Sequence, residues 1–296
     1  MIDHPFADRP GLAPADYLAS VGTVFARFDS RTQDSGNVSF GVEAGGRRWF
    51  VKSAGDPQDR SPFLSHAARV ALLENAQALA RSVRSPALPA LAGSAWSAWG
   101  PMLVYEWAAG ELVHAPAERR DDPASAFRRF RSLPPAQATA AIDAILEAHV
   151  ELCGAGWIAG DFYDGSILYD FEARRLHLID LDSYHRGPTV NEMGRMFGST
   201  RFMAPEEFER GAAIDERTTV FNLGGAMAEY LGDGGLERAG FRGADDQHAA
   251  MARAARRRPT SGSPRSPNWR APSAARRPPS PESEGSAGRL SSILRP

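Results

Sequence analysis

The chain has 296 residues, 43% hydrophobic and 24% charged, which is ordinary for one large or two small soluble globular domains. Its net charge of −2 predicts neither a nucleic-acid nor a membrane partner for the folded part, and no apolar run approaches the roughly 20 residues of a membrane span. The single cysteine, Cys153, excludes an intrachain disulfide and a cysteine-rich metal site, and the first residues lack the pattern of a signal peptide. We therefore expect a cytoplasmic protein, and the sequence leaves its oligomeric state open.

The first part of the chain is predicted to be rich in β-strands. Residues 1–19 are interpreted as an N-terminal extension and residues 20–107 as the β-rich unit. Alternating apolar residues predict strands over 21–28, 38–43, 48–52 and 101–107, with a hairpin turn at 44–46. Apolar residues at helical spacing predict one embedded helix, Leu64 to Val83, which Pro86 ends.

Residues 108–249 are predicted to be mainly helical. A helix is expected from Pro135 to Cys153, and His149 within it is interpreted as a packed side chain rather than a ligand. Two short strands are expected over 166–169 and 176–179. A last helix is expected from Val220 to Leu231, with none after it.

Residues 250–296 differ sharply in composition from the rest. Residues 252–296 hold ten Arg and two Glu, a net charge of +8, which leaves −10 for the remainder of the chain. The segment is rich in Pro, Ser and Gly and has no apolar periodicity, so it is predicted to be a disordered basic tail. A passive tail is favoured over an interaction arm. A shifted reading frame in GC-rich DNA would produce the same abrupt change, and that alternative stays open.

Lys52 is the only lysine, although the chain has 34 cationic Lys and Arg residues. Lysine is a compact point charge on a thin stem, whereas arginine is a flat fork. A lone lysine at the end of a predicted strand therefore indicates a site where a guanidinium does not fit. Drift in a genome whose codon bias favours arginine is the alternative.

Several motifs follow Lys52 in a fixed order. They are Glu74, Glu106-Trp107, Gly160-Asp161-Phe162-Tyr163-Asp164-Gly165-Ser166, Asp180-Leu181-Asp182 and Gly198-Ser199-Thr200-Arg201-Phe202-Met203-Ala204-Pro205-Glu206. From about Val24 to Leu231 this ordered set resembles the protein kinase superfamily, in the form of a divergent bacterial Ser/Thr kinase. The resemblance implies an α+β, two-lobed fold, with a β-rich N-terminal lobe, a mainly helical C-terminal lobe, and ATP and Mg²⁺ bound between them.

The resemblance also implies a role for each candidate residue. Lys52 is expected to contact the α/β-phosphates and to pair with Glu74, and Asp161 to accept the proton of the substrate hydroxyl. The expected metal ligands are Asp180, Ser166 and Asp182. The remaining candidates are Gly36 and Val38 at the phosphate loop, Glu106 and Trp107 at the adenine-binding hinge, and Ser199 as a further catalytic residue.

Some positions depart from the family's pattern. Only Gly36 of the phosphate loop's glycines is evident, and Ala159-Gly160 stands where the family has His-Arg. Ser166, a neutral and weaker Mg²⁺ ligand, replaces an asparagine, while Asp182 adds a carboxylate in place of a glycine. Thr219 stands where the family has an aspartate that braces the catalytic loop, and a threonine brings no charge there.

Three functions remain open on this basis. The first is a protein Ser/Thr kinase that phosphorylates a protein or itself, favoured by the resemblance at residues 198–206. The second is a pseudokinase that binds nucleotide without turnover, favoured by Ser166, by Thr219 and by the expected lack of the family's further helices after Leu231. The third is a small-molecule kinase similar to the aminoglycoside and choline phosphotransferases, favoured by the Gly160-Asp161 and Asp180-Leu181-Asp182 pattern.

Overall fold

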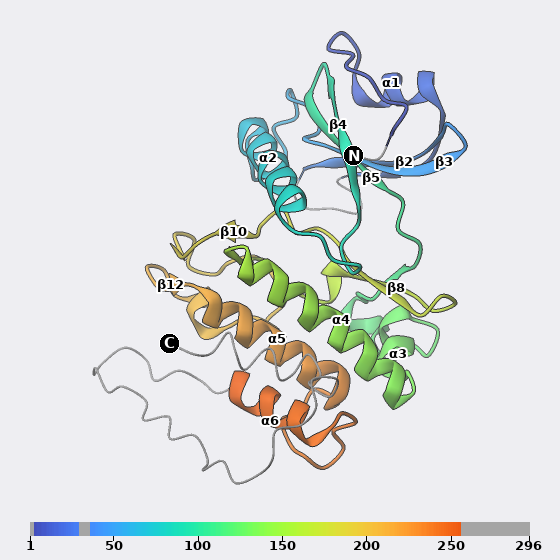
Figure 1. Cartoon of the computed structure of the whole chain (residues 1–296). Helices are drawn as coiled ribbons and strands as arrows, with labels where there is room; N and C mark the ends of the chain where they lie inside the picture. The colour runs from blue at the N-terminus through green and yellow to red at the C-terminus, as the bar shows by residue number, and fades with distance from the viewer. Residues whose placement is uncertain (1–2, 30–35, 256–296) are drawn as a thin grey trace.

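The first part of the structure is built on one antiparallel sheet (Figure 1). The computed structural model describes residues 3–29 and 36–255. Five strands pair in the order β1-β2-β3-β5-β4, and two helices pack on them. The elements are α1 (Pro14–Val21), β1 (Thr23–Phe28), β2 (Val38–Ala44), β3 (Arg47–Ser53), α2 (His66–Ser82), β4 (Leu91–Ser97) and β5 (Gly100–Glu106).

The two faces of this sheet are covered by different elements. On one face α1 packs Tyr17 into a core with Trp49 and Val51 of β3. Because side chains alternate along a strand, Lys52 lies on the opposite face. Its partner in β5 is Leu103, which packs in a second cluster with residues of α2. The sheet therefore presents Lys52 on the α2 side.

The second part is mainly helical and has its own core. Its elements are β6 (Glu111–Leu112), α3 (Ala126–Arg131), α4 (Pro135–Gly154), β7 (Trp157–Ile158), β8 (Ile167–Asp170), β9 (Arg175–Leu178), β10 (His185–Arg186), β11 (Thr189–Val190), β12 (Ala213–Ile214), α5 (Glu216–Leu231) and α6 (Asp245–Ala254). Helices α3 to α6 lie together below the sheet in Figure 1. The fold belongs to the α+β class. Within the described ranges, no helix combines the length and hydropathy that crossing a bilayer requires.

The three helices predicted from apolar periodicity are present as α2, α4 and α5. Helix α5 begins at Glu216, four residues before the predicted start. Its N-cap is Asp215, whose carboxylate accepts a hydrogen bond from the backbone N–H of Arg217 at 2.9 Å. The first turn is polar in sequence, and periodicity alone therefore does not reveal it.

Several elements were not predicted, and two boundaries were wrong. Helix α1 lies inside the supposed N-terminal extension and ends at Val21, where a strand was expected. Strand β4 and helix α3 were also missed. Helix α6 contradicts the expected end of the helical part at Leu231 and the tail boundary at residue 250, because Met251 is fully buried. The rest of the predicted tail, 256–296, lies outside the described residues.

Candidate active site

The ammonium of Lys52 is held between two carboxylates. Lys52 is only 6% exposed, and its Nζ lies 2.7 Å from Asp180 Oδ1 and 2.5 Å from Asp182 Oδ2. Burial opposes the charged form of Lys52, but the two carboxylates outweigh it and raise its pKa. These contacts join strand β3 to the loop that follows β9. The expected convergence of Lys52 and Asp180 is present in the structure.

The two carboxylates have different surroundings. The side chain of Asp180 is 63% exposed, whereas that of Asp182 is 11% exposed. Lys52 lowers the pKa of Asp180, while burial raises the pKa of Asp182 in spite of the same neighbour. Asp180 is thus the carboxylate of the pair that a ligand from solvent can reach.

Asp161 carries a carboxylate oxygen without a partner. Its Oδ1 is buried and has no hydrogen-bond partner among the described residues. Burial, with smaller contributions from the charges of Asp180 and Glu207, raises the pKa of Asp161 to about 7. Asp161 and Asp180 both adopt left-handed backbone conformations, with φ of 59° and 58°. This conformation is uncommon outside glycine and is concentrated at functional sites.

Of the two serines proposed for the site, Ser166 contacts Asp161, and Ser199 follows a glycine that approaches it. Ser166 is 1% exposed, and its hydroxyl donates to the backbone carbonyl of Asp161 at 3.2 Å. Ser199 is half-buried, and its carbonyl accepts from the backbone N–H of Phe202 at 2.9 Å. The glycine before it, Gly198, approaches closely, since a Cβ there would lie 3.4 Å from Asp161 Oδ1.

Two buried residues pack beside this loop, and one of them, Thr219, hydrogen-bonds its backbone. Thr219 Oγ1 accepts a hydrogen bond from the N–H of Ala159 at 2.9 Å in a buried position, so its hydroxyl braces the loop without a charge. His149 is fully buried, and its Nε2 lies 2.8 Å from the hydroxyl of Tyr184. Burial lowers the pKa of His149 to about 4. The interpretation of His149 as a packed side chain is confirmed.

The expected ion pair between Lys52 and Glu74 is absent. Glu74 is exposed on α2 and lines a cavity of about 270 Å³ with Asp8 and Trp96, on the side of the helix that faces β4. The next residue, Asn75, faces the site instead. Its side-chain amide donates to the carbonyl of Asp182 at 2.9 Å. The helix therefore reaches the Asp180–Asp182 loop through a neutral amide.

Val38, expected at the nucleotide site, does not face the Lys52 side of the sheet. It packs with the core beneath α1, because it shares a face with Phe40 of β2. The β2 residue paired with Lys52 is Ser39. Gly36 has a φ of 79°, and its carbonyl accepts from Arg69 Nη1 at 2.8 Å. The rest of the expected phosphate loop, 30–35, lies outside the described residues.

Aromatic side chains cover the sheet beside Lys52. Phe50 shares the face of Lys52, and its ring centroid lies 6.5 Å from those of Tyr105 and Trp107. Phe25 lies 4.8 Å from Trp107, edge to face. Gly41 leaves the space for these two rings, since a Cβ there would approach them to 2.6 and 2.9 Å. These rings form a half-exposed aromatic surface at the expected adenine position.

The backbone of the expected hinge is partly engaged within the sheet. The N–H of Glu106 donates to Ala90 and that of Trp107 to Arg48. The carboxylate of Glu106 pairs with Arg47. Glu106 is also paired with Trp49 of β3, so the backbone of Trp107, the residue after β5, is the less engaged part of the expected hinge.

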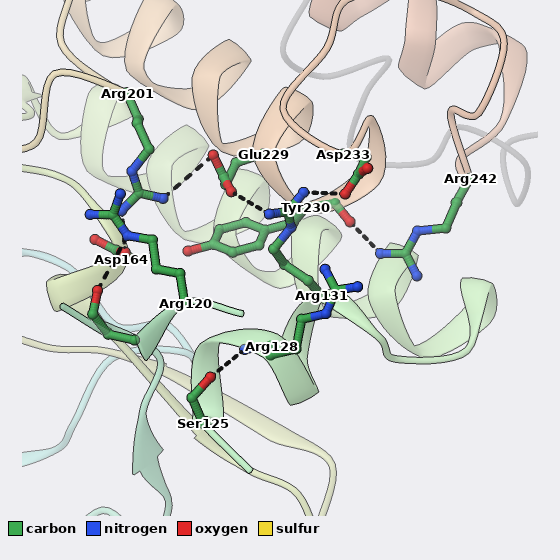
Figure 2. A network of polar contacts seen from close by, with 11 residues as sticks. Arg120, Ser125, Arg128, Arg131, Asp164, Arg201, Glu229, Tyr230, Asp233 and Arg242 are labelled. Carbon is green, nitrogen blue, oxygen red and sulfur yellow. Dashed lines mark hydrogen bonds and ion pairs between the residues drawn. The ribbon is translucent and has the colours of Figure 1, made fainter. Parts of the chain in front are cut away.

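Arg201 links three elements of the helical part in a buried polar network (Figure 2). It pairs with Asp164, a fully buried residue of the loop that contains Asp161. Its Nη1 lies 3.4 Å from Glu229 Oε2 on α5, and Arg131 of α3 pairs with the same Glu229 at 3.4 Å. These ion pairs connect the segment after Gly198 to the loop that contains Asp161 and to helices α3 and α5.

Sequence reasoning missed Asn75, Asp164 and Arg201. The buried positions on α2 are 69, 73, 76 and 79, so a helical wheel drawn on them would have warned that Glu74 faces elsewhere. Asp164 and Arg201 are opposite charges inside two motifs that were already recognised, which was a usable signal.

Comparison with known proteins gives no family assignment. No protein-family model matches the chain, and no curated protein matches it significantly. The function is therefore argued from the site.

Proposed function

We propose that the chain is a two-lobed, protein kinase-like phosphotransferase that transfers the γ-phosphoryl group of ATP to a Ser or Thr hydroxyl of a protein. The observation that carries the proposal is the contact between Lys52 and Asp180, with Asp161 near enough for the charge of Asp180 to contribute to its raised pKa. Phosphoryl transfer needs a cation for the phosphates, a carboxylate for the metal and a carboxylate for the acceptor hydroxyl.

The chain's own groups divide these tasks. The exposed carboxylate of Asp180 is suited to a metal ligand, and Lys52 beside it to a phosphate contact. In the described residues no group of three or more His, Cys, Asp or Glu could hold a metal ion. A magnesium ion would therefore share its ligands with the phosphates, and when bound it neutralises charge on the transferring group.

Asp161 is suited to accept the proton of the attacking hydroxyl. Its partnerless Oδ1 offers the acceptor, and a pKa of about 7 matches the operating range of a general base near neutrality. The left-handed backbone of Asp161 is stabilised from below by the Thr219 brace. A base can stack on the aromatic surface next to Lys52.

A pseudokinase is the second candidate, and Ser166 favours it. The hydroxyl of Ser166 is buried and donates to the carbonyl of Asp161. Because Ser166 is only 1% exposed, its hydroxyl oxygen is poorly placed to reach a second metal ion from solvent. Nucleotide binding through Lys52 and Asp180 would survive this loss, whereas efficient transfer would not.

Radiolabelled ATP distinguishes the two candidates. The native chain, Asp161→Asn and Lys52→Ala are each incubated with Mg²⁺ or Mn²⁺, generic protein acceptors and a panel of choline and aminoglycosides. An exposed carboxylate, Asp121, supplies the control Asp121→Asn. We expect transfer to protein that both site variants lose and the control keeps. Nucleotide-dependent thermal stabilisation without transfer would support the pseudokinase, and absence of both would refute the proposal.

A further inference from the structure

The two carboxylates around Lys52 are not equivalent, and their difference assigns them separate tasks. Asp180 contacts Lys52 from an exposed position, while Asp182 does so from a buried one. If one of these carboxylates binds a metal ion that arrives from solvent, it must turn at least partly away from the Lys52 ammonium. Asp180 can do so. Lys52 then still has Asp182, and no buried charge is left unpaired.

The loop that carries Asp182 is tied to the first part of the structure by two asparagines. Asn75 of α2 donates to the carbonyl of Asp182 at 2.9 Å and also to the carbonyl of Tyr184. Asn37, which is 1% exposed, lies with its Nδ2 3.5 Å from Asp182 Oδ2. These contacts hold Asp182 where it faces Lys52.

Helix α2 contributes no charged partner to Lys52. Glu74 is exposed and lies with Asp8 and Trp96 on the β4 side of the helix. The helix is hydrogen-bonded to the loop through the Asn75 amide, which donates to the backbone carbonyls of Asp182 and Tyr184. A displacement of α2 would therefore break amide hydrogen bonds, and the ion pairs of Lys52 would remain.

We propose that Asp182 is a positioning residue that permanently anchors Lys52, so that the lysine is held from the Asp180–Asp182 loop after β9 and not from helix α2. The inference rests on the proposed nucleotide site and replaces the expectation that Asp182 is a metal ligand. It also means that α2 does not switch the site on by delivering a carboxylate. Asp180 alone of the pair then carries the metal.

The first arm of the test does not depend on enzyme activity. Because Lys52 is the only lysine, a full-length chain labelled with ¹⁵N-lysine has one side-chain ammonium signal. We expect that signal to be lost or strongly shifted in Asp182→Asn and kept in Asp182→Glu and in the control Glu74→Gln. A signal that survives Asp182→Asn but disappears in Glu74→Gln would overturn the inference. The Glu74→Gln and Asp182→Glu variants keep the test decisive if Asp182→Asn fails to fold.

The second arm separates an anchor from a metal ligand. The Kd of ATP is measured by calorimetry in EDTA and again with Mg²⁺. An anchor acts through Lys52, so Asp182→Asn should weaken both values by about tenfold and leave the Mg²⁺ enhancement unchanged. Asp180→Asn should abolish most of that enhancement. Loss of the enhancement in Asp182→Asn, with unchanged affinity in EDTA, would show a metal ligand and refute the anchor.

The two arms also distinguish the inference from the function on which it rests. If the native chain binds no ATP under either condition, the proposed function fails, while the ammonium signal still decides whether Asp182 holds Lys52. If ATP binds and Glu74→Gln weakens it as strongly as Asp182→Asn does, the nucleotide site stands and the inference fails.

Discussion

Replacing Arg201 by methionine tests how much the buried network of Figure 2 contributes to the free energy of unfolding. The change keeps an extended side chain and removes the charge that pairs with fully buried Asp164. Removing one partner of a buried pair costs about 3–5 kcal/mol, because the other charge stays buried and uncompensated. Two features reduce the cost here: Arg201 is itself 21% exposed, and His114 stays 3.2 Å from Asp164. We expect about 2–3 kcal/mol of lost stability.

Urea denaturation of the full-length chain, followed by circular dichroism, measures this loss. The matched control is Arg119→Met, which breaks a pair with Asp122 in which the arginine is 63% exposed. That change should cost less than about 0.5 kcal/mol. Adding Asp164→Asn to Arg201→Met should restore at least about 1 kcal/mol, because it removes the buried charge left behind. A loss below about 1 kcal/mol for Arg201→Met, made larger by Asp164→Asn, would refute the reasoning.

Three further changes probe the loop that carries Asp161. Thr219→Val should lower the free energy of urea unfolding by about 1–3 kcal/mol, because it leaves the buried N–H of Ala159 without an acceptor. Thr219→Ser should lose much less, because it keeps the hydroxyl. Equal losses in the two variants would contradict the hydrogen bond's role. Because the folded pKa of His149 is about 4, below its unfolded value, its stabilising effect is lost as pH falls, and the advantage of the native chain over His149→Gln should shrink by about 2–3 kcal/mol between pH 7 and 4. For Asp161 the folded pKa of about 7 lies above the unfolded value, so stability is lost as pH rises through 7. In EDTA, Asp161→Asn should then exceed the native chain by about 1 kcal/mol or more at pH 8 and by less at pH 4, and a pH-independent difference would contradict the shift.

Residues near the site were predicted best where local order along the chain decides their position. Strand alternation fixes which face of β3 carries Lys52, and a hairpin of two short strands brings the loop with Asp180 back to it. The fold class followed from the same patterns. Asp161 was chosen as a candidate from a contiguous motif, residues 160–166, so the choice did not depend on pairing with a distant element.

Pairings between elements were predicted poorly, and helix phase explains the clearest error. Glu74 was chosen because an acidic residue was expected on the helix after Lys52, but one residue changes direction by about 100° around a helix. The buried stripe of α2 runs through Leu73 and Ala76, which turns Glu74 outward and Asn75 toward the loop. Val38 was expected at the nucleotide site but packs beneath α1, because successive residues of a strand face opposite sides of the sheet.

Elements stabilised mainly by tertiary contacts escaped the sequence patterns. Strand β4 has the sequence Leu-Ala-Gly-Ser-Ala-Trp-Ser, which is poor in β-branched residues, and it exists through its pairing with β5. Helix α6 is rich in Ala, contains one Arg, and ends inside the predicted tail. Its docking depends on Gly224 of α5, where a Cβ would lie 2.8 Å from Ala254 Cβ. Neither contact can be read from the segment itself.

The contrast between Lys52 and Arg201 explains why a chain that otherwise uses arginine keeps one lysine. At Arg201 the guanidinium lies 5.3 and 5.2 Å from the ring centres of Phe127 and Phe202, and its fork spans two separate carboxylates. At Lys52 both carboxylates converge on a single atom, at 2.7 and 2.5 Å, and the lysine itself is only 6% exposed. A compact ammonium satisfies that geometry, whereas a planar fork would push the carboxylates apart and move Asp180 from the position where a metal would meet it. The choice of residue thus follows from the shape of each site, and codon bias is not needed to explain it.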